Sequence, residues 1–121
     1  MCVSQDLHLG KGIARTFKRN FGGISELKKQ NLRVGDVGIL LRKGRYIYNL
    51  VTKDMYYSKP SYPTLKKALE SMRAHINSSA VKSVSIPKIS CGLDGLKWVI
   101  VKQIIEDVFH TLPLTITVFI K

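Results

Sequence analysis

The clearest periodic pattern lies in residues 62–78, where apolar positions recur every three or four residues. They predict a helix with one apolar stripe, formed by Leu65, Leu69, Met72 and Ile76. Pro63 suits the first turn of this helix, because its missing N–H is not needed there. A second, more apolar run predicts another helix over 96–109.

Short runs rich in β-branched and aromatic residues predict strands around these helices. The expected strands are 37–42, 46–53, 83–86 and 114–120. A tight turn at Lys43-Gly44 joins the first two. Residues 1–4 read as the tail of a further strand, and residues 10–30 as a Gly-rich turn followed by two short helices.

Strands that alternate with helices predict an α/β fold, with a mostly parallel central sheet covered on both faces. The chain has 121 residues, which suits a single domain over 1–121. A chain of this length buries roughly 65% of its unfolded surface, enough for a hydrophobic core.

The charge balance changes this ordinary picture. Lys and Arg number 20 against 8 acidic residues, which gives a formal net charge of +12. Such a surface favours polyanionic or phosphate-bearing partners, including nucleic acid. A solvated basic face without a partner is the alternative.

Cysteine and histidine positions predict no metal site and no cofactor. Cys2 and Cys91 have no CxxC spacing, and the three histidines are scattered. No run approaches the roughly 20 apolar residues of a membrane span, and the first ten residues lack a signal-peptide pattern. We therefore expect an intracellular protein, nuclear or cytoplasmic, that is not bound to membranes.

Two Gly-rich turns, in residues 7–14 and 90–95, fall where a strand is followed by a helix. Glycine lets the backbone approach a ligand closely, and helix starts present N–H groups to anions. Neither turn is a P-loop or a GxGxxG fingerprint. Together they suggest a ligand with two phosphates, or with a phosphate and a sugar; two ordinary tight turns are the alternative.

Four stretches in order, "GKGIARTFKRNFGG", "GRYIYNLVTK", "KPSYPTLKKALESMRAH" and "IPKISCGLDGLKW", resemble a macrodomain. More narrowly, they are similar to macrodomains of the terminal ADP-ribose protein glycohydrolase, or O-acetyl-ADP-ribose deacetylase, type. The resemblance implies a three-layer α/β/α fold with a mixed, mostly parallel sheet that binds ADP-ribose. It also implies removal of mono-ADP-ribose from protein glutamate or aspartate, deacetylation of O-acetyl-ADP-ribose, and a place in the DNA damage response.

The resemblance also implies which residues carry the chemistry. Lys53, in "NLVTK", matches the catalytic lysine that attacks the anomeric carbon of the distal ribose, and Asp94, in "CGLD", matches the aspartate that resolves the lysine adduct. The matching substrate-binding positions are Ser4, Gly10, Gly12, Ile13, Ala14, Lys88, Ile89, Ser90, Cys91, Gly92, Leu93 and Lys121.

Ordinary structural roles for the same two residues also stay open at this point. Lys53 ends a strand, where lysine side chains often extend outward into water. Asp94 precedes a helix, where Asp is a favoured N-cap worth about 1 kcal/mol. A free lysine is uncharged in only about one molecule in 2,500 at pH 7, so a nucleophilic Lys53 needs a desolvated setting.

The chain departs from the family pattern at its start and in one loop. The family's first strand, and the acidic adenine-binding motif after it, have no counterpart before residue 1, and Ser90 replaces a loop glycine. We therefore expect a monomeric hydrolase acting on mono-ADP-ribosylated proteins, with weakened adenine recognition. With the resemblance, the basic surface makes poly-ADP-ribose or nucleic acid a further expected partner. The alternative is a non-enzymatic reader that binds ADP-ribose or nucleic acid through its basic surface.

Overall fold

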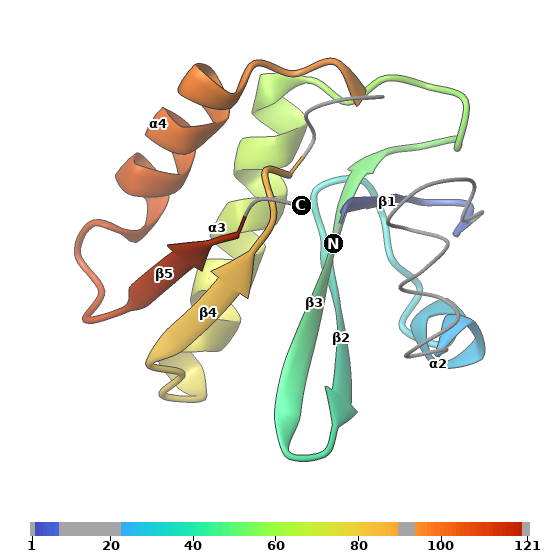
Figure 1. The fold of residues 1–121 in the computed structure, drawn as a ribbon. Coiled ribbons are helices and arrows are strands. Elements are labelled where there is room, and N and C mark those ends of the chain that lie inside the picture. Colours follow the sequence, from blue (N-terminus) through green and yellow to red (C-terminus); the bar gives the residue numbers. More distant parts are fainter. Residues whose placement is uncertain (1, 8–22, 90–93, 120–121) are drawn as a thin grey trace.

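The computed structural model describes residues 2–7, 23–89 and 94–119. Its elements are β1 (Cys2–Ser4), α2 (Ile24–Lys28), β2 (Val37–Arg42), β3 (Arg45–Lys53), α3 (Tyr62–Ser78), β4 (Ser83–Ile86), α4 (Trp98–Phe109) and β5 (Thr115–Val118) (Figure 1). The predicted helices and strands are present, with ends that shift by a few residues. The first of the two short helices expected within 10–30 falls largely outside the described residues.

The described strands form two sheets rather than the one shared sheet that the sequence led us to expect. One sheet has the order β1-β3-β2, with β1 parallel and β2 antiparallel to β3, and the other is the parallel pair β4-β5. The mixed, mostly parallel character is thus confirmed for the described strands. The three residues of β1 pair with Leu50, Val51 and Lys53, and the register shifts after Val3.

Helix α3 forms where the apolar stripe predicted it. Its start is fixed by a reciprocal capping box, in which the Ser61 side chain accepts a hydrogen bond from Thr64 N–H and the Thr64 hydroxyl accepts one from Ser61 N–H. The stripe residues, together with Ala68, are buried. They pack with the buried residues of α4 into the larger hydrophobic core.

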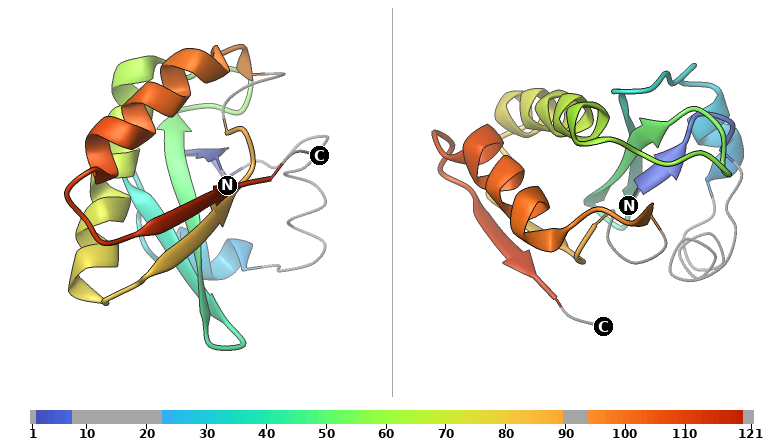
Figure 2. Two further views of the ribbon diagram at one scale, coloured as in Figure 1. Left: turned by 60° about the vertical axis from the view of Figure 1, so that its left-hand side comes forward. Right: turned by 90° about the horizontal axis from the view of Figure 1, so that it is seen from above.

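A smaller core lies on the opposite face of the β1-β3-β2 sheet. It contains Val3, Leu7, Leu27, Leu40 and Val51, so α2 covers this face through Leu27. Figure 2 shows α3 and α4 on one side and α2 on the other. This is the three-layer α/β/α arrangement that the sequence predicted.

Two searches of the described residues bear on function. None of the described helices has the length and apolar character needed to cross a membrane. Within the same part of the chain, no three His, Cys, Asp or Glu side chains gather in a group that could hold a metal ion.

Candidate active site

Lys53 and Asp94 meet at the carboxyl end of β3. Lys53 Nζ lies 3.0 Å from Asp94 Oδ1, and the two side chains are 16% and 21% exposed. Forty-one residues separate them in sequence. In Figure 1 the end of β3 and the segment leading into α4 lie at one end of the molecule, and the turn between β2 and β3 lies at the other.

The backbone around Lys53 is held from two sides. On one side, Gln5 N–H donates to Lys53 O at 2.8 Å, and Asp6 N–H donates to Asp54 O at 3.1 Å. On the other, the Thr64 hydroxyl of α3 donates to Thr52 O at 2.7 Å. The position of the amine is therefore set by both a neighbouring strand and a helix start.

Asp94 is not the N-cap of α4. The helix begins at Trp98 and its N-cap residue is Lys97, three positions after Asp94. Gly95 lies between them with φ of +79°, a left-handed conformation that glycine adopts without strain. The carboxylate contacts Lys53 Nζ instead, so the capping interpretation of Asp94 is wrong.

The start of α4 is tied to the start of α3 instead. Lys97 N–H donates to the hydroxyl of Tyr62 at 3.1 Å. This bond satisfies a backbone donor at the helix terminus that a capping side chain would otherwise satisfy. It also fixes the segment that follows Asp94 against the layer that holds Thr64.

The Lys53–Asp94 contact can support chemistry as well as structure. A distance of 3.0 Å is within the range over which a carboxylate takes a proton from, or returns it to, a neighbouring amine. Both side chains are largely removed from water, which strengthens their interaction relative to a pair in bulk solvent. The Lys53 side chain therefore does not extend outward into water, as the structural alternative expected.

Ser4 lies beside Lys53 but points its hydroxyl elsewhere. It pairs with Lys53 across the β1–β3 ladder and is buried. Its hydroxyl donates to Asp6 Oδ1, and Asp6 Oδ2 accepts a hydrogen bond from Tyr56 N–H at 3.2 Å. Asp6 thus joins the end of β1 to the loop after β3, a role that the sequence analysis missed. A contact between Ser4 and substrate stays a prediction.

The remaining predicted site residues separate into two groups. Ile89 is buried in the larger core, so only its backbone is left for a ligand, and Lys88 Nζ lies 6.0 Å from the centre of the Trp98 ring. The others lie outside the described residues: Gly10, Gly12, Ile13, Ala14, Ser90, Cys91, Gly92, Leu93 and Lys121.

Hydrogen bonds also stabilise an acid next to Lys53. The Ser58 side chain and the Met55 N–H donate to the carboxylate of Asp54, and these two bonds lower its pKa. Asp54 is therefore a fixed negative charge at the turn where the chain leaves β3.

Comparisons with known proteins agree with this architecture. The family model described as "Macro domain" matches residues 2–105. The chain is 47% identical over 118 residues to "ADP-ribose glycohydrolase OARD1" of Bos taurus, and 46% identical to the protein of the same name from Homo sapiens. Each match covers 98% of this chain and 78% of the relative.

Solved structures show the same fold at lower identity. The macrodomain of DarG from Thermus aquaticus superposes with a TM-score of 0.86 at 24% identity, covering 98% of this chain and 85% of that one. The macrodomain of DarG from Mycobacterium tuberculosis gives 0.88 at 23% identity, covering 98% and 84%. With a family model that matches most of its length, this chain belongs to the macrodomain family.

Proposed function

We propose that this chain hydrolyses the bond between mono-ADP-ribose and a protein carboxylate, with Lys53 as nucleophile and Asp94 as its proton-transfer partner. The observation that carries the proposal is the 3.0 Å contact between Lys53 Nζ and Asp94 Oδ1 at the end of a buried strand. Relatives that are 46–47% identical are named ADP-ribose glycohydrolases, which supports a hydrolase acting on an ADP-ribosyl group. A solved macrodomain-containing protein of the same fold, DarTG from Thermosipho africanus, is described in complex with ADP-ribose.

The first step transfers ADP-ribose to the enzyme. Deprotonated Lys53 Nζ attacks the anomeric carbon of the distal ribose, a C–N bond forms, and the C–O bond to the ester breaks. The released glutamate or aspartate side chain leaves as a carboxylate. Asp94 takes the proton that the new amine sheds, for which the 3.0 Å separation is suitable.

The second step regenerates the free enzyme. Water attacks the anomeric carbon while Asp94 holds or removes its proton, the C–N bond breaks, and Lys53 regains a proton. ADP-ribose leaves with a hydroxyl at the anomeric carbon. The same two steps apply to O-acetyl-ADP-ribose when the acetyl ester is on the anomeric oxygen, with acetate as the first leaving group.

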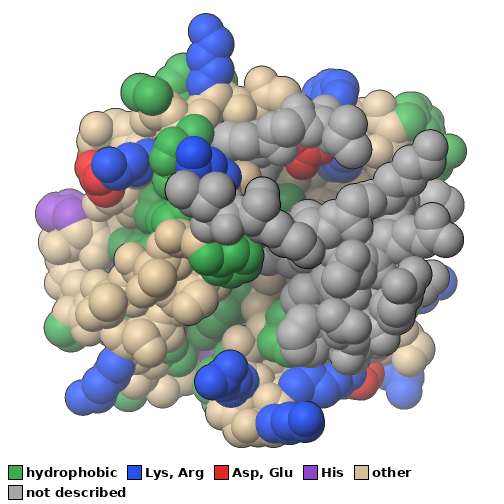
Figure 3. Space-filling model, viewed as in Figure 1, with side chains coloured by type: hydrophobic (Ala, Val, Ile, Leu, Met, Phe, Trp, Pro, Cys, Tyr) green, Lys and Arg blue, Asp and Glu red, His purple; other side chains and the backbone are tan. Residues whose placement is uncertain are grey.

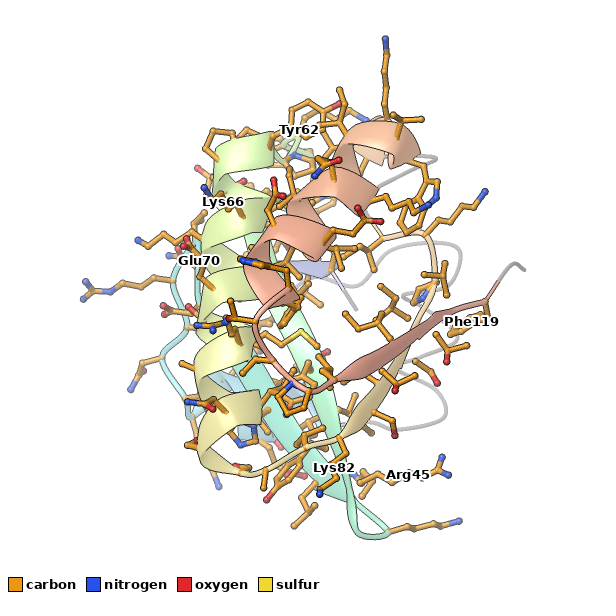
Figure 4. The ribbon with its side chains drawn as sticks, turned by 90° about the vertical axis from the view of Figure 1, so that its left-hand side faces the viewer. Arg45, Tyr62, Lys66, Glu70, Lys82 and Phe119 are labelled. Carbon is orange, nitrogen blue, oxygen red and sulfur yellow. The ribbon has the colours of Figure 1, made fainter. Side chains whose placement is uncertain are left out.

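Trapping the covalent intermediate tests this assignment. In Asp94→Ala the amine can still attack, because solvent can take the proton that it sheds, but the group that removes the proton of the attacking water in the second step is missing. A lysine-linked ADP-ribose adduct therefore accumulates and turnover falls by roughly 10²–10⁴-fold. Intact mass followed by peptide mapping places the adduct on the peptide that contains Lys53. Lys53→Ala forms no adduct, and Lys66→Ala, which removes an exposed lysine of α3, behaves as the wild type (Figure 4).

Two results contradict the proposal. An Asp94→Ala protein with full turnover shows that the carboxylate takes no part in the reaction. An adduct that also forms in Lys53→Ala shows that another group attacks the sugar.

A reader of polyanions is a second candidate, and one observation favours it. Basic side chains gather at the end of the molecule opposite Lys53: Lys43 lies in the turn between β2 and β3, Arg45 begins β3, and Lys82 directly precedes β4. Binding through them falls steeply with salt, because bound cations are released from the nucleic acid. ADP-ribose bound in a pocket loses less affinity over the same range, so equal salt slopes for both ligands favour the reader.

A further inference from the structure

The ladder between β1 and β3 is interrupted directly before Lys53. Val3 pairs with Val51. The next residue of β1, Ser4, pairs with Lys53, so Thr52 is the extra residue on β3. A bulge of this kind bends the strand that carries it and changes the direction of the side chains beside it. The direction of the Lys53 amine therefore depends on what holds the two strand ends beyond the bulge.

Asp6 bridges these two strand ends through its carboxylate. Its Oδ1 accepts a hydrogen bond from the Ser4 hydroxyl, on β1, and its Oδ2 accepts one from Tyr56 N–H at 3.2 Å, in the loop after β3. Its backbone N–H also donates to Asp54 O at 3.1 Å. Lys53 lies between these contacts, because Ser4 is its partner in the ladder and Asp54 is the next residue in the chain. Asp6 therefore holds the end of β3 both from the ladder and from the loop.

The charge of Asp6 is unfavourable for the acid beside it. Hydrogen bonds from Ser58 and Met55 lower the pKa of the Asp54 carboxyl. The nearby charge of Asp6 acts in the opposite direction, so the two carboxylates repel one another. The chain has 20 basic and 8 acidic residues, and Figure 3 shows basic side chains spread over one face of the described residues with few acidic ones among them. Two acids side by side are thus not explained by charge pairing, and unfavourable local interactions of this kind are expected at functional sites.

We propose that Asp6 is a positioning residue for the nucleophile, because its carboxylate holds the bulged end of β3 in the arrangement that directs Lys53 Nζ at the anomeric carbon. This role rests on the hydrolysis proposed above, and Asp6 acts through Ser4 and the loop at Tyr56 rather than on the sugar. Attack needs the amine about 3–3.5 Å from the carbon, and a displacement of about 1 Å can slow a reaction by about 10²-fold. Loss of Asp6 therefore slows the attack. It leaves the affinity for ADP-ribose unchanged, because binding of this product does not need the amine in its attacking position.

The rate of adduct formation in the Asp94→Ala background tests this role. In that protein the lysine adduct accumulates, so intact mass follows the first chemical step by itself, with a protein mono-ADP-ribosylated on glutamate as substrate. Asp6→Asn keeps an oxygen for the Ser4 hydroxyl but replaces the acceptor of Tyr56 N–H with an amide nitrogen, and we expect adduct formation about tenfold slower. Asp6→Ala removes both acceptors, and we expect a loss of about 10²-fold. Calorimetry is expected to give the same affinity for ADP-ribose in all of these proteins.

A purely structural role for Asp6 gives a different result. Its loss then lowers the melting temperature, but well below that temperature the protein that binds ADP-ribose still forms the adduct at the rate of Asp94→Ala alone. Asp107→Ala is the matched control. The Asp107 carboxylate also accepts a hydrogen bond, from Gln103 Nε2 at 2.9 Å, but it does so in the last turn of α4. This control is expected to leave the rate of adduct formation unchanged.

Ser4→Ala keeps the test decisive if the Asp6 variants do not fold. It removes the link to β1 and leaves the Asp6 carboxylate bonded to Tyr56 N–H. Slower adduct formation at saturating substrate, with unchanged affinity for ADP-ribose, supports the positioning role. An unchanged rate at saturating substrate overturns it, whether or not the affinity falls.

Failure of the positioning role and failure of the proposed function look different. If Asp94→Ala forms the adduct on Lys53, and the Asp6 variants form it at the same rate, Asp6 does not position the amine and hydrolysis through Lys53 stands. If Asp94→Ala forms no adduct on Lys53, the proposed function is wrong and the role of Asp6 is wrong with it.

Discussion

The two ends of β3 differ in how completely they are surrounded. At Lys53 the strand is bonded to the end of β1, contacted by the Thr64 hydroxyl of α3 and paired through its side chain with Asp94. At Arg45 and Tyr46 it is paired with β2 on one side and, on the other, lines a groove between β3 and β4 whose floor includes Met72 of α3. One strand therefore has a closely held amine at one end and, at the other, a part that pairs with only one of the described strands, which teaches that holding the amine does not require pairing along the whole strand.

The largest expected effect is on turnover, from a substitution at Lys53 that removes the nucleophile and keeps the positive charge. Lys53→Arg keeps a cation opposite Asp94, but a guanidinium is not deprotonated in proteins and cannot act as the nucleophile. We expect turnover to fall by roughly 10³-fold or more, as when an attacking group is removed. A single-turnover assay measures the loss, and a melting curve checks that the fold is intact. Appreciable activity in this variant contradicts nucleophilic attack by Lys53.

The next effect compares packing near the two ends. Leu65 and Met72 lie on the same stripe of α3, but only Met72 borders the groove. Truncating a buried Leu or Met to Ala costs about 2–5 kcal/mol, depending on the cavity that is left. We expect Leu65→Ala near the upper end of this range and Met72→Ala near the lower end, because the groove is already open beside Met72. Urea unfolding measures both, and equal losses contradict the difference in packing.

A smaller effect on stability appears at high pH and concerns Tyr48, in the half of β3 nearer Arg45. Burial, with the charge of neighbouring Tyr46, raises the pKa of Tyr48 to about 12 from its ordinary value of 10.0, and its hydroxyl lies 2.7 Å from His75 Nδ1. The folded protein thus holds this proton more tightly than the unfolded chain. The associated stability is fully present below pH 10 and is lost as the pH rises toward 12, by at most about 2–3 kcal/mol.

Measuring unfolding free energy between pH 9 and 12 checks this expectation. Tyr48→Phe is the matched control, because it keeps the ring and removes the titrating group. The variant is expected to lose less stability over this range than the wild type. Identical slopes contradict a raised pKa for Tyr48.

The smallest expected effect concerns the capping box at the start of α3, near Lys53. Ser61→Ala removes one half of the capping box of α3 and costs about 1 kcal/mol, as for other N-cap residues. Thermal unfolding measures the loss. Ser78→Ala, near the other end of the same helix, is the control, because its hydroxyl donates only to the backbone oxygen of His75.

Periodicity along the chain predicted what depends on neighbours in sequence. The stripe of α3 and the strand pattern up to Lys53 could be found because burial repeats at helical or strand spacing. The meeting of Lys53 with Asp94 could not be derived in this way, since 41 residues separate them, and only the family resemblance paired them. The alternative interpretation of Asp94 as a helix cap was wrong, because α4 begins at Trp98 and its N-cap residue is Lys97.

The split sheet is a second feature that periodicity does not reveal. The described strands form one sheet of three and a separate pair, and which strands pair is a matter of tertiary structure rather than of composition. Asp6 was missed for a similar reason: its carboxylate joins Ser4 to Tyr56, which is fifty residues away in sequence. A polar residue directly after the strand was the one available signal for it.

The Thr64 hydroxyl has a consequence for heat inactivation. The same oxygen accepts the Ser61 N–H at the start of α3 and donates to Thr52 O, the carbonyl just before Lys53. Helix ends fray before whole domains unfold, because terminal turns have the lowest local opening free energy. Fraying of this one turn releases the strand that orients the amine. On mild heating, catalysis should therefore decline while the hydrophobic core, and with it the circular dichroism of the protein, is still intact.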